Sequence, residues 1–323
     1  MAGQKVLVTG CGGELGSLAT LLLEEQPWVG SILGVDADPP RRRLNRTNFK
    51  RVALNQTANV AQIIMDFDPH LIVHLGVWEP NARLSPDEAD RTTSDVGRAV
   101  FDAAHQSQSL EAVVLRSGLE VYGARSHAPL TPNEFTSTAP ASRYGRMLHF
   151  LERQAADLRA SRGVAVTNLR LAPVLGAHVP SPLGRLLRLP AVPFLLAGDP
   201  EFTVIEDHDA ALAFTLAAQH RFDGSINVMA EGSITARKAA LIGKRLPVPV
   251  VGPGWWVARQ LANVAGAPVP DHVVETLRHG RLAHHSDNSR QIHFAPRHTT
   301  HEVIARLFEW PSVVRVPAAQ RAA

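Results

Sequence analysis

Short apolar runs alternate with longer amphipathic segments along the first half of the chain. The short runs predict five strands, over residues 5–9, 31–36, 70–75, 112–117 and 165–170. The longer segments between them have helical periodicity and predict four helices, over residues 15–25, 58–67, 87–106 and 144–161. Strands that are rich in Val, Ile and Leu and separated by helices are typical of a parallel sheet covered on both faces. The pattern therefore predicts an α/β fold built on a doubly wound parallel sheet.

The pattern changes after Leu171, where proline and glycine become frequent as far as Pro200. A strand over 202–205, a helix over 207–219 and a strand over 225–228 are predicted next, and helices resume near Thr235. We expect residues 1–171 to form the main domain and residues 172–316 to form a smaller C-terminal substrate lobe, interleaved with the last elements of the sheet. Residues 317–323 are expected to be a frayed tail.

Composition narrows the class of protein. The chain has 323 residues, 45% of them apolar, which is enough to bury a globular core. Its 33 basic and 30 acidic residues nearly balance, and without a long basic run or a known motif no nucleic-acid partner is expected. Cys11 is the only cysteine, which excludes an internal disulfide and favours a reducing compartment. Because no apolar signal segment precedes the first strand, we expect a cytoplasmic location.

No run of apolar residues is long enough to predict a membrane span. The nearest approach is the segment 183–197, which Arg185, Arg188 and two prolines interrupt. We interpret it as a core-facing helix and loop of the second lobe, and a segment lying on a membrane surface is the alternative.

A glycine-rich turn joins the first predicted strand to the first predicted helix. Gly10, Gly13 and Gly16 are spaced by three residues, within Thr9-Gly-Cys-Gly-Gly-Glu-Leu-Gly16. The first glycine permits a tight turn, the second lets a pyrophosphate approach the backbone, and the third lets the helix pack closely on the strand. The start of the helix, with Glu14 and Leu15, offers free N–H groups to the phosphates. The sequence therefore predicts a Rossmann domain that binds a dinucleotide.

The end of the second predicted strand bears on the choice of cofactor. Asp36 follows Gly16 by twenty residues, where a carboxylate is expected to bind the adenosine ribose hydroxyls, and this favours NAD. The basic cluster at residues 41–43 follows closely and leaves NADP as the alternative, because an arginine there could bind a 2′-phosphate.

Several further segments occur in the order typical of one family. They are Ile72-Val-His-Leu-Gly76, Val121-Tyr-Gly123, Ser142-Arg-Tyr-Gly145, Leu169-Arg-Leu-Ala-Pro-Val-Leu-Gly176, the 205–211 segment with Asp209 in the aspartate position, and Asp287-Asn-Ser-Arg290 followed by Phe294-Ala-Pro296. Together with the glycine turn, they resemble the extended short-chain dehydrogenases/reductases, in particular the NAD-dependent epimerase/dehydratase family that acts on nucleotide sugars. The resemblance spans most of the chain.

The resemblance implies further residues and partners. It places Asn55 near the adenine, and Leu75 and Gly76 beside the cofactor at the end of the strand before them. It also implies a small-molecule substrate, a nucleotide sugar in most relatives, and a homodimer that pairs through the helices predicted at 87–106 and 144–161.

The catalytic residues of the family are only partly kept. Relatives use a tyrosine, a lysine four residues later, a Ser or Thr after the fifth strand, and commonly an Asn. Here Tyr144 is present, but the other three positions hold Leu148, Gly118 and Ser94. Ser117 serves as the hydroxyl residue if the alignment shifts by one position. In the family the lysine lowers the tyrosine pKa, so the proton relay is altered in this chain, and Arg116 or a residue of the second lobe is a candidate substitute.

Two hypotheses follow from this departure. The first is an NAD(P)-dependent oxidoreductase or epimerase-like enzyme with Tyr144 as its acid/base. The second is a dinucleotide-binding sensor, scaffold or partner protein without turnover, in which Tyr144 is a packed aromatic on an amphipathic helix.

The late histidines, including His284 and His285, have no usual zinc spacing, so no metal site is predicted.

Overall fold

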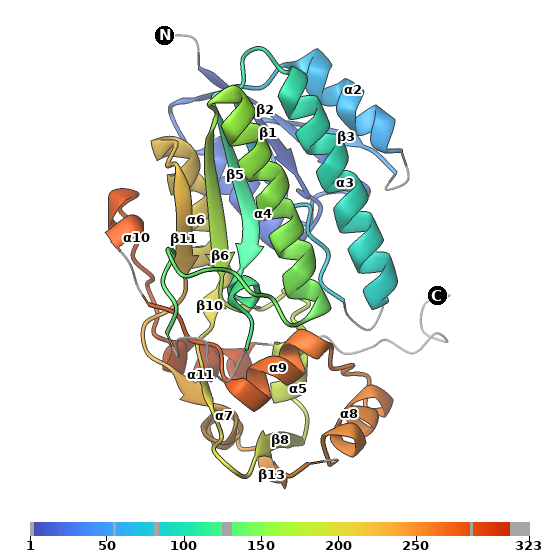
Figure 1. Ribbon diagram of the computed structural model, residues 1–323, viewed down its shortest axis with the longest axis vertical. Coiled ribbons are helices and arrows are strands. Elements are labelled where there is room, and N and C mark those ends of the chain that lie inside the picture. Colours follow the sequence, from blue (N-terminus) through green and yellow to red (C-terminus); the bar gives the residue numbers. More distant parts are fainter. Residues whose placement is uncertain are drawn as a thin grey trace.

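The computed structural model describes residues 3–53, 56–80, 84–124, 131–252, 254–284 and 287–310. Its centre is a seven-stranded sheet in the order β11-β6-β5-β4-β1-β2-β3, in which every neighbouring pair is parallel (Figure 1). The strands are β1 (Gln4–Thr9), β2 (Val29–Asp36), β3 (Thr47–Arg51), β4 (Leu71–His74), β5 (Ala112–Gly118), β6 (Ala165–Leu171) and β11 (Gly224–Val228).

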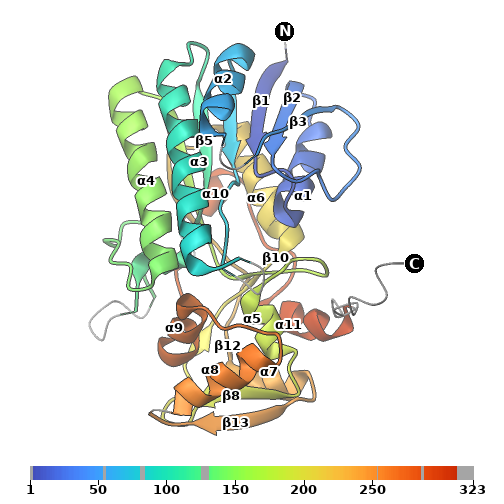
Figure 2. The same cartoon turned by 90° about the vertical axis from the view of Figure 1, so that its right-hand side faces the viewer.

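Helices cover both faces of this sheet. One layer contains α2 (Thr57–Phe67), α3 (Pro86–Gln106) and α4 (Arg143–Arg162), and the other contains α1 (Glu14–Glu24) and α6 (Asp207–His220) (Figure 2). The central strands are buried because Val, Ile and Leu side chains point into both layers, as in β4, where all four residues are buried. The predicted doubly wound α/β fold is therefore confirmed.

Several strands differ from the sequence expectation, and the short strands of the second lobe were not predicted: β7 (Val174–Leu175), β8 (Ala191–Leu195), β12 (Ile234–Thr235) and β13 (Leu246–Val250). The edge strand β3 was not predicted, because its residues Thr-Asn-Phe-Lys-Arg are mostly polar and exposed and show no apolar run. The prediction of a single strand over 202–205 is wrong. The structure has two short strands there, β9 (Glu201–Phe202) and β10 (Ile205–Glu206). They separate because β9 pairs with β12, whereas β10 pairs with β7.

The second lobe lies at the carboxyl edge of the sheet and has a core of its own (Figure 1). Its remaining elements are β8, β13, α5 (Pro182–Leu187), α7 (Ala236–Ile242), α8 (Gly254–Val264), α9 (Asp271–His279) and α11 (Thr300–Glu309). Two short helices pack on the main domain instead: η1 (Leu119–Tyr122) beside α4, and α10 (Asp287–Gln291) beside β11. Leu183, Leu186 and Leu187 of α5 are buried in this core, which supports the core-facing interpretation of the start of the 183–197 segment. The loop expected in the rest of that segment is wrong, because residues 191–195 form β8, which pairs with β13.

None of the helices in the described parts of the chain has the length and apolarity needed to cross a membrane.

Candidate active and cofactor site

The glycine turn after β1 has the geometry that its sequence predicts. Gly10 has a φ of +78°, and a side chain there would come within 2.5 Å of the Gly76 amide. A Cβ on Gly16 would collide with the Gly10 carbonyl oxygen, so this glycine lets α1 approach β1. By contrast, a Cβ on Gly13 would have its nearest neighbour 3.6 Å away, at the Gly10 carbonyl oxygen. The surface above Gly13 therefore has room for a ligand group.

The first turn of α1 keeps its hydrogen-bonding capacity. Gly13 is the N-cap residue and has no side chain, and no other described side chain caps the helix. The first amides of a helix have no partner within the helix, and they attract anions together with the helix dipole. Glu14 and Leu15 contribute their backbones here, while their side chains are buried. This turn therefore fits the diphosphate of a dinucleotide.

Asp36 lies beside the same turn, at the end of β2. Its Oδ2 accepts a hydrogen bond of 2.8 Å from the Gly12 amide, and its Oδ1 accepts one of 3.2 Å from the Asp38 amide. Burial raises the pKa of this carboxyl above its usual range. Its closeness to the turn fits the expected position of a carboxylate that binds ribose hydroxyls.

The basic cluster after β2 folds back onto α1. The Arg42 guanidinium forms a 2.6 Å ion pair with Glu14, and the Arg41 amide donates a 2.9 Å hydrogen bond to Ser17 Oγ. Arg42 is therefore already paired with a carboxylate. Asn55 lies outside the described residues.

Leu75 and Gly76 complete this part of the site. The Leu75 amide donates to the Thr9 carbonyl at 2.9 Å, and Gly76 borders Gly10. The structure thus brings the glycine turn, Asp36 and the Leu75–Gly76 backbone together at the carboxyl ends of β1, β2 and β4, where ligands of open α/β sheets bind.

A polar pocket of about 450 Å³, counted to its open mouth, lies between the sheet and α9. It contains Tyr144, and its charged and polar lining comes from both lobes: Glu79, Arg116, Glu120, His272 and Thr276. The enclosed part of this pocket is small, about 30 Å³, which is room for one or two water molecules.

Tyr144 is placed by the start of α4. Ser142 caps the helix by accepting a hydrogen bond from the Gly145 amide at 3.2 Å, so Tyr144 lies in the first turn. Its ring packs on the imidazole of His272 from α9, with the ring centroids 4.6 Å apart and the rings inclined by 35°. His272 Nε2 is in turn 2.9 Å from Glu79 Oε1. This contact joins the second lobe to the loop after β4.

The electrostatics around Tyr144 differ from those that a lysine would create. Burial raises the pKa of its phenol well above the ordinary value, and the charges of Glu79 and Glu120 add to the rise. The charge and hydrogen bond of Arg116 oppose it. The Tyr144 side chain is therefore a neutral phenol near pH 7, and Arg116 is the cation in its surroundings that favours the phenolate.

The three replaced positions have structural explanations or roles of their own. Leu148, in the lysine position, is fully buried in the core. A Cβ on Gly118 would collide with Glu120 Oε2, so the Glu120 carboxylate occupies the space of the family's hydroxyl side chain. Ser117 does not fill that role, because its hydroxyl donates a 2.6 Å hydrogen bond to Glu152. Ser94, in the Asn position, is half-buried on α3.

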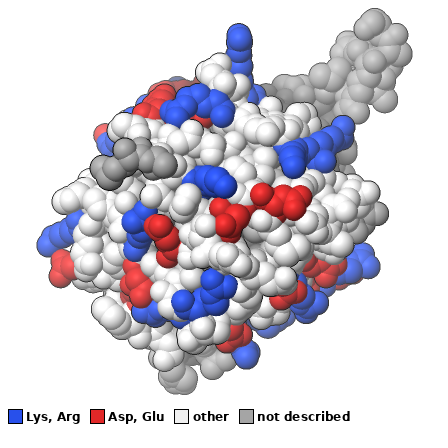
Figure 3. Space-filling model, turned by 90° about the horizontal axis from the view of Figure 1, so that it is seen from above, with Lys and Arg blue, Asp and Glu red and all other residues white. Residues whose placement is uncertain are grey.

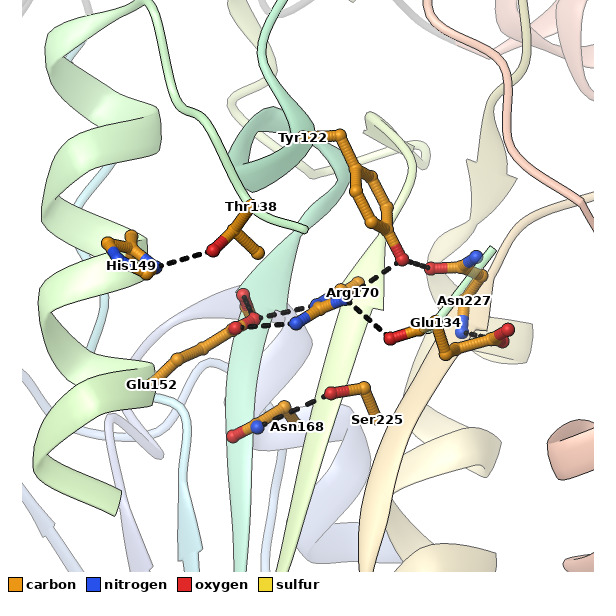
Figure 4. A network of polar contacts seen from close by, with 10 residues as sticks. Tyr122, Glu134, Thr138, His149, Glu152, Asn168, Arg170, Ser225 and Asn227 are labelled. Atoms are coloured by element: carbon orange, nitrogen blue, oxygen red, sulfur yellow. Dashed lines mark hydrogen bonds and ion pairs between the residues drawn. The ribbon is translucent and has the colours of Figure 1, made fainter. Parts of the chain in front are cut away.

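Glu152 belongs to a buried polar network that fixes α4 against the sheet (Figure 4). Arg170 of β6 donates to both carboxylate oxygens of Glu152, at 2.9 and 2.8 Å, and to the Tyr122 hydroxyl at 2.9 Å. Tyr122 then donates to Asn227 Oδ1 of β11 at 2.7 Å. The network accounts for the chain's other tyrosine and sets the position of the helix that carries Tyr144.

A group of acids lies where α6 begins, next to α1. Burial raises the pKa of Asp207 to about 6, and the charges of Glu206 and Glu14 contribute, while Arg42 opposes them. Asp207 and three pocket residues, Glu79, Glu120 and His272, were not predicted from the sequence. These come from separate elements, and no local pattern links them.

Comparisons with known proteins agree with this architecture. Residues 6–228 match the NAD dependent epimerase/dehydratase family. An uncharacterized protein of Mycobacterium tuberculosis strain H37Rv is 28% identical over 318 residues, which cover 94% of this chain and 83% of that protein.

Two solved structures share the fold over nearly their whole length. A UDP-glucose 4-epimerase from Brucella ovis in complex with NAD superposes with a TM-score of 0.73 at 17% identity, over 94% of this chain and 97% of that one. A UDP-N-acetylglucosamine 4-epimerase from Methanobrevibacter ruminantium M1 superposes with a TM-score of 0.71 at 19% identity, over 96% and 98%.

Proposed function

The chain belongs to the NAD-dependent epimerase/dehydratase family, and from this premise we propose that it binds NAD and carries out hydride-transfer chemistry on a hydroxylated substrate, with nucleotide sugars as the substrate class. The UDP-sugar epimerases that share its fold support this choice of substrate. Any carbon of the sugar that bears a hydroxyl group could be the one that exchanges hydride with NAD.

The chain's own residues would hold NAD along the carboxyl edge of the sheet. The amides of the Gly10–Gly16 turn would hold the diphosphate, and Asp36 would hold the adenosine ribose. NAD is favoured over NADP because Asp36 would repel a 2′-phosphate and Arg42 is paired with Glu14. When bound, NAD supplies a reversible acceptor for hydride, so the protein must manage the accompanying proton.

Tyr144 is our candidate for that proton transfer. Its phenol would donate a proton to the substrate oxygen in reduction, and its phenolate would accept the hydroxyl proton in oxidation. Arg116 takes over part of the electrostatic role of the missing lysine, because it is the group that lowers the phenol pKa. This relation between Arg116 and Tyr144 is the observation that supports an enzyme. His272, held by Glu79, positions the phenol ring.

The experiment compares Tyr144→Phe and Arg116→Gln with wild type, using NAD and a panel of UDP-sugars. Tyr144→Phe should reduce turnover by about 10²–10⁴-fold, the usual size of a general acid/base contribution, while NAD affinity is kept. Arg116→Gln should shift the alkaline limb of the pH–rate profile to higher pH, because it removes the positive charge that lowers the pKa of Tyr144. Arg153→Gln, which removes an exposed arginine of α4, is the matched control. Equal turnover by wild type and Tyr144→Phe contradicts the assignment.

A second candidate is a dinucleotide-binding protein without turnover. It is favoured by the buried Leu148 in the lysine position and by the raised pKa of Tyr144. Tight NAD binding by the wild type, with no UDP-sugar converted, supports this candidate against the first.

Two further parts of the proposal concern the assembly and the location. We propose a homodimer that pairs through α3 and α4, which lie side by side on one flank of the molecule (Figure 2). Light scattering after size exclusion tests it, and a monomer at micromolar concentration contradicts it. We also propose a cytoplasmic location, which the single buried Cys11 accommodates.

A further inference from the structure

Large apolar side chains are exposed mainly at one end of the molecule. Among the described residues, ten such side chains are exposed, and Phe135 is the one that lies elsewhere. The other nine form what we call the distal apolar surface: Leu196, Leu241, Leu246, Val248, Val251, Trp256, Val257, Leu261 and Val264. They belong to α7, α8, β13 and the residues directly after β8 and β13, which pack together at the end of the second lobe farthest from the sheet (Figures 1 and 2).

The helix α8 presents its apolar side to solvent. Val257, Leu261 and Val264 follow the helical spacing i, i+4, i+7 and so share one face, and Trp256 lies about 100° round the helix from Val257, at the edge of that face. Trp256, Leu261 and Val264 are 67%, 66% and 87% exposed. The opposite side of the helix is already packed, through Trp255, on the core of the lobe. Packing of the lobe core therefore does not require the exposed face of α8. An exposed apolar patch of this kind marks an interaction site.

The neighbouring strand β13 adds to the same surface and limits what can bind there. Leu246 and Val248 point outwards, and Leu246 is 65% exposed. Pro247 and Pro249 alternate with them and lack the N–H groups that pairing with a further strand would use. A partner that adds a strand to this edge is therefore disfavoured.

The segment that carries most of the surface is basic. Residues 232–270 contain five basic residues and no Asp or Glu: Arg237, Lys238, Lys244, Arg245 and Arg259. The side chains of Arg237, Lys238 and Lys244 are exposed. Acids border this region: Asp271 pairs with Arg259 at 3.0 Å, Asp199 accepts a hydrogen bond from the Arg237 amide, Glu201 accepts one of 2.6 Å from Ser233 Oγ, and Glu231 precedes the segment. At the opposite end of the molecule, basic and acidic side chains are mixed (Figure 3).

We infer that the distal apolar surface binds the surface of a lipid bilayer that contains anionic lipid. An amphipathic helix with tryptophan on its apolar face and basic residues nearby is suited to lie in the interface, parallel to the membrane plane. The lysines and arginines would contact lipid phosphates while the apolar side chains of α8 and β13 enter the acyl boundary. A second copy of the chain is a poorer occupant, because it would bring two basic regions together.

The test is co-sedimentation of the full chain with two kinds of vesicle, phosphatidylcholine alone and phosphatidylcholine mixed with phosphatidylglycerol. Wild type should sediment with the mixed vesicles, less with the neutral ones, and less at high salt. The double variant Trp256→Ser/Leu261→Ser should lose binding by at least tenfold, and Lys238→Gln/Lys244→Gln by about fivefold per charge. The changed residues are exposed, so thermal melts should stay at the wild-type midpoint. Phe135→Ser, at the 85% exposed apolar residue outside the surface, is the matched control and should bind like wild type.

Two outcomes overturn the inference. One is that wild type binds neither kind of vesicle. The other is that the Trp256→Ser/Leu261→Ser variant sediments as well as wild type and Phe135→Ser. If wild type ignores vesicles but self-associates, and the double variant is monomeric, the surface is an interface between copies of the chain.

Discussion

Asp207 offers a quantitative test of the electrostatics at the start of α6. It is the first residue of the helix, and its Oδ1 accepts a 2.8 Å hydrogen bond from the His208 amide. A Cβ on Gly176 would collide with its carboxylate, so the group is closely packed. Asp207→Asn keeps the shape and the hydrogen-bond acceptor but removes the ionisation. The perturbation therefore isolates the charge.

The size of the effect follows from the pKa. Burial raises the pKa of Asp207 from its usual 3.8 to about 6. Because the folded-state pKa is raised, the associated stability is fully present below the unfolded pKa and is lost as pH rises through the folded one. A shift of roughly two units corresponds to about 3 kcal/mol at 1.36 kcal/mol per unit, and partial exposure reduces it to about 1–3 kcal/mol.

The assay is urea unfolding of wild type and Asp207→Asn at several pH values between about 4 and 8. The variant should match wild type at the acid end and become more stable by about 1–3 kcal/mol at the neutral end. Asp157→Asn, which neutralises an exposed acid on α4, should show no such trend and is the matched control. A stability difference that does not change with pH refutes the reasoning, because it would mean that the Asp207 pKa is the same in both states.

Three further predictions concern α4 and the pocket. Arg170→Met should lower the free energy of unfolding by about 3–5 kcal/mol, because it leaves Glu152 buried without its cation; a loss below 1 kcal/mol in urea unfolding contradicts this. The rate of substrate oxidation should still increase above pH 9 or so, because burial raises the pKa of Tyr144 and the base form is scarce near neutrality; a profile that levels off near pH 7 assigns the base to another group. Leu148→Lys should raise kcat for oxidation, because it restores a cation four residues after Tyr144, and an unchanged kcat in a folded variant argues against a weakened relay.

The sequence predicted the sheet well because its central strands are buried on both faces. Their continuous apolar runs, separated by segments of helical periodicity, are compatible with few folds other than a parallel sheet. The edge strand β3 is mostly polar and exposed, so its sequence does not distinguish it from a loop. The glycine turn and Asp36 could also be identified from the sequence, because a backbone that approaches a phosphate needs glycines at fixed spacing. Both signals are contained within one or two consecutive elements.

The residues that line the polar pocket could not be predicted from local sequence patterns, because they come from separate elements. Glu79, Glu120 and His272 lie on a loop, on η1 and on α9, and only the packing of the second lobe on the first brings them to Tyr144. The sequence assigned Leu148 and Gly118 to the family's lysine and hydroxyl positions. It could not show that a carboxylate from residue 120 fills the space at Gly118, because that depends on side-chain direction.

The most direct test of the central claim is calorimetric titration of the purified chain with NAD and with NADP. We expect one NAD per chain with micromolar affinity and weaker binding of NADP. We also expect at least tenfold weaker NAD binding for Gly13→Val, whose side chain would fill the open surface at the turn. The absence of a binding signal with either dinucleotide at millimolar concentration would show that the glycine turn and Asp36 do not form a dinucleotide site.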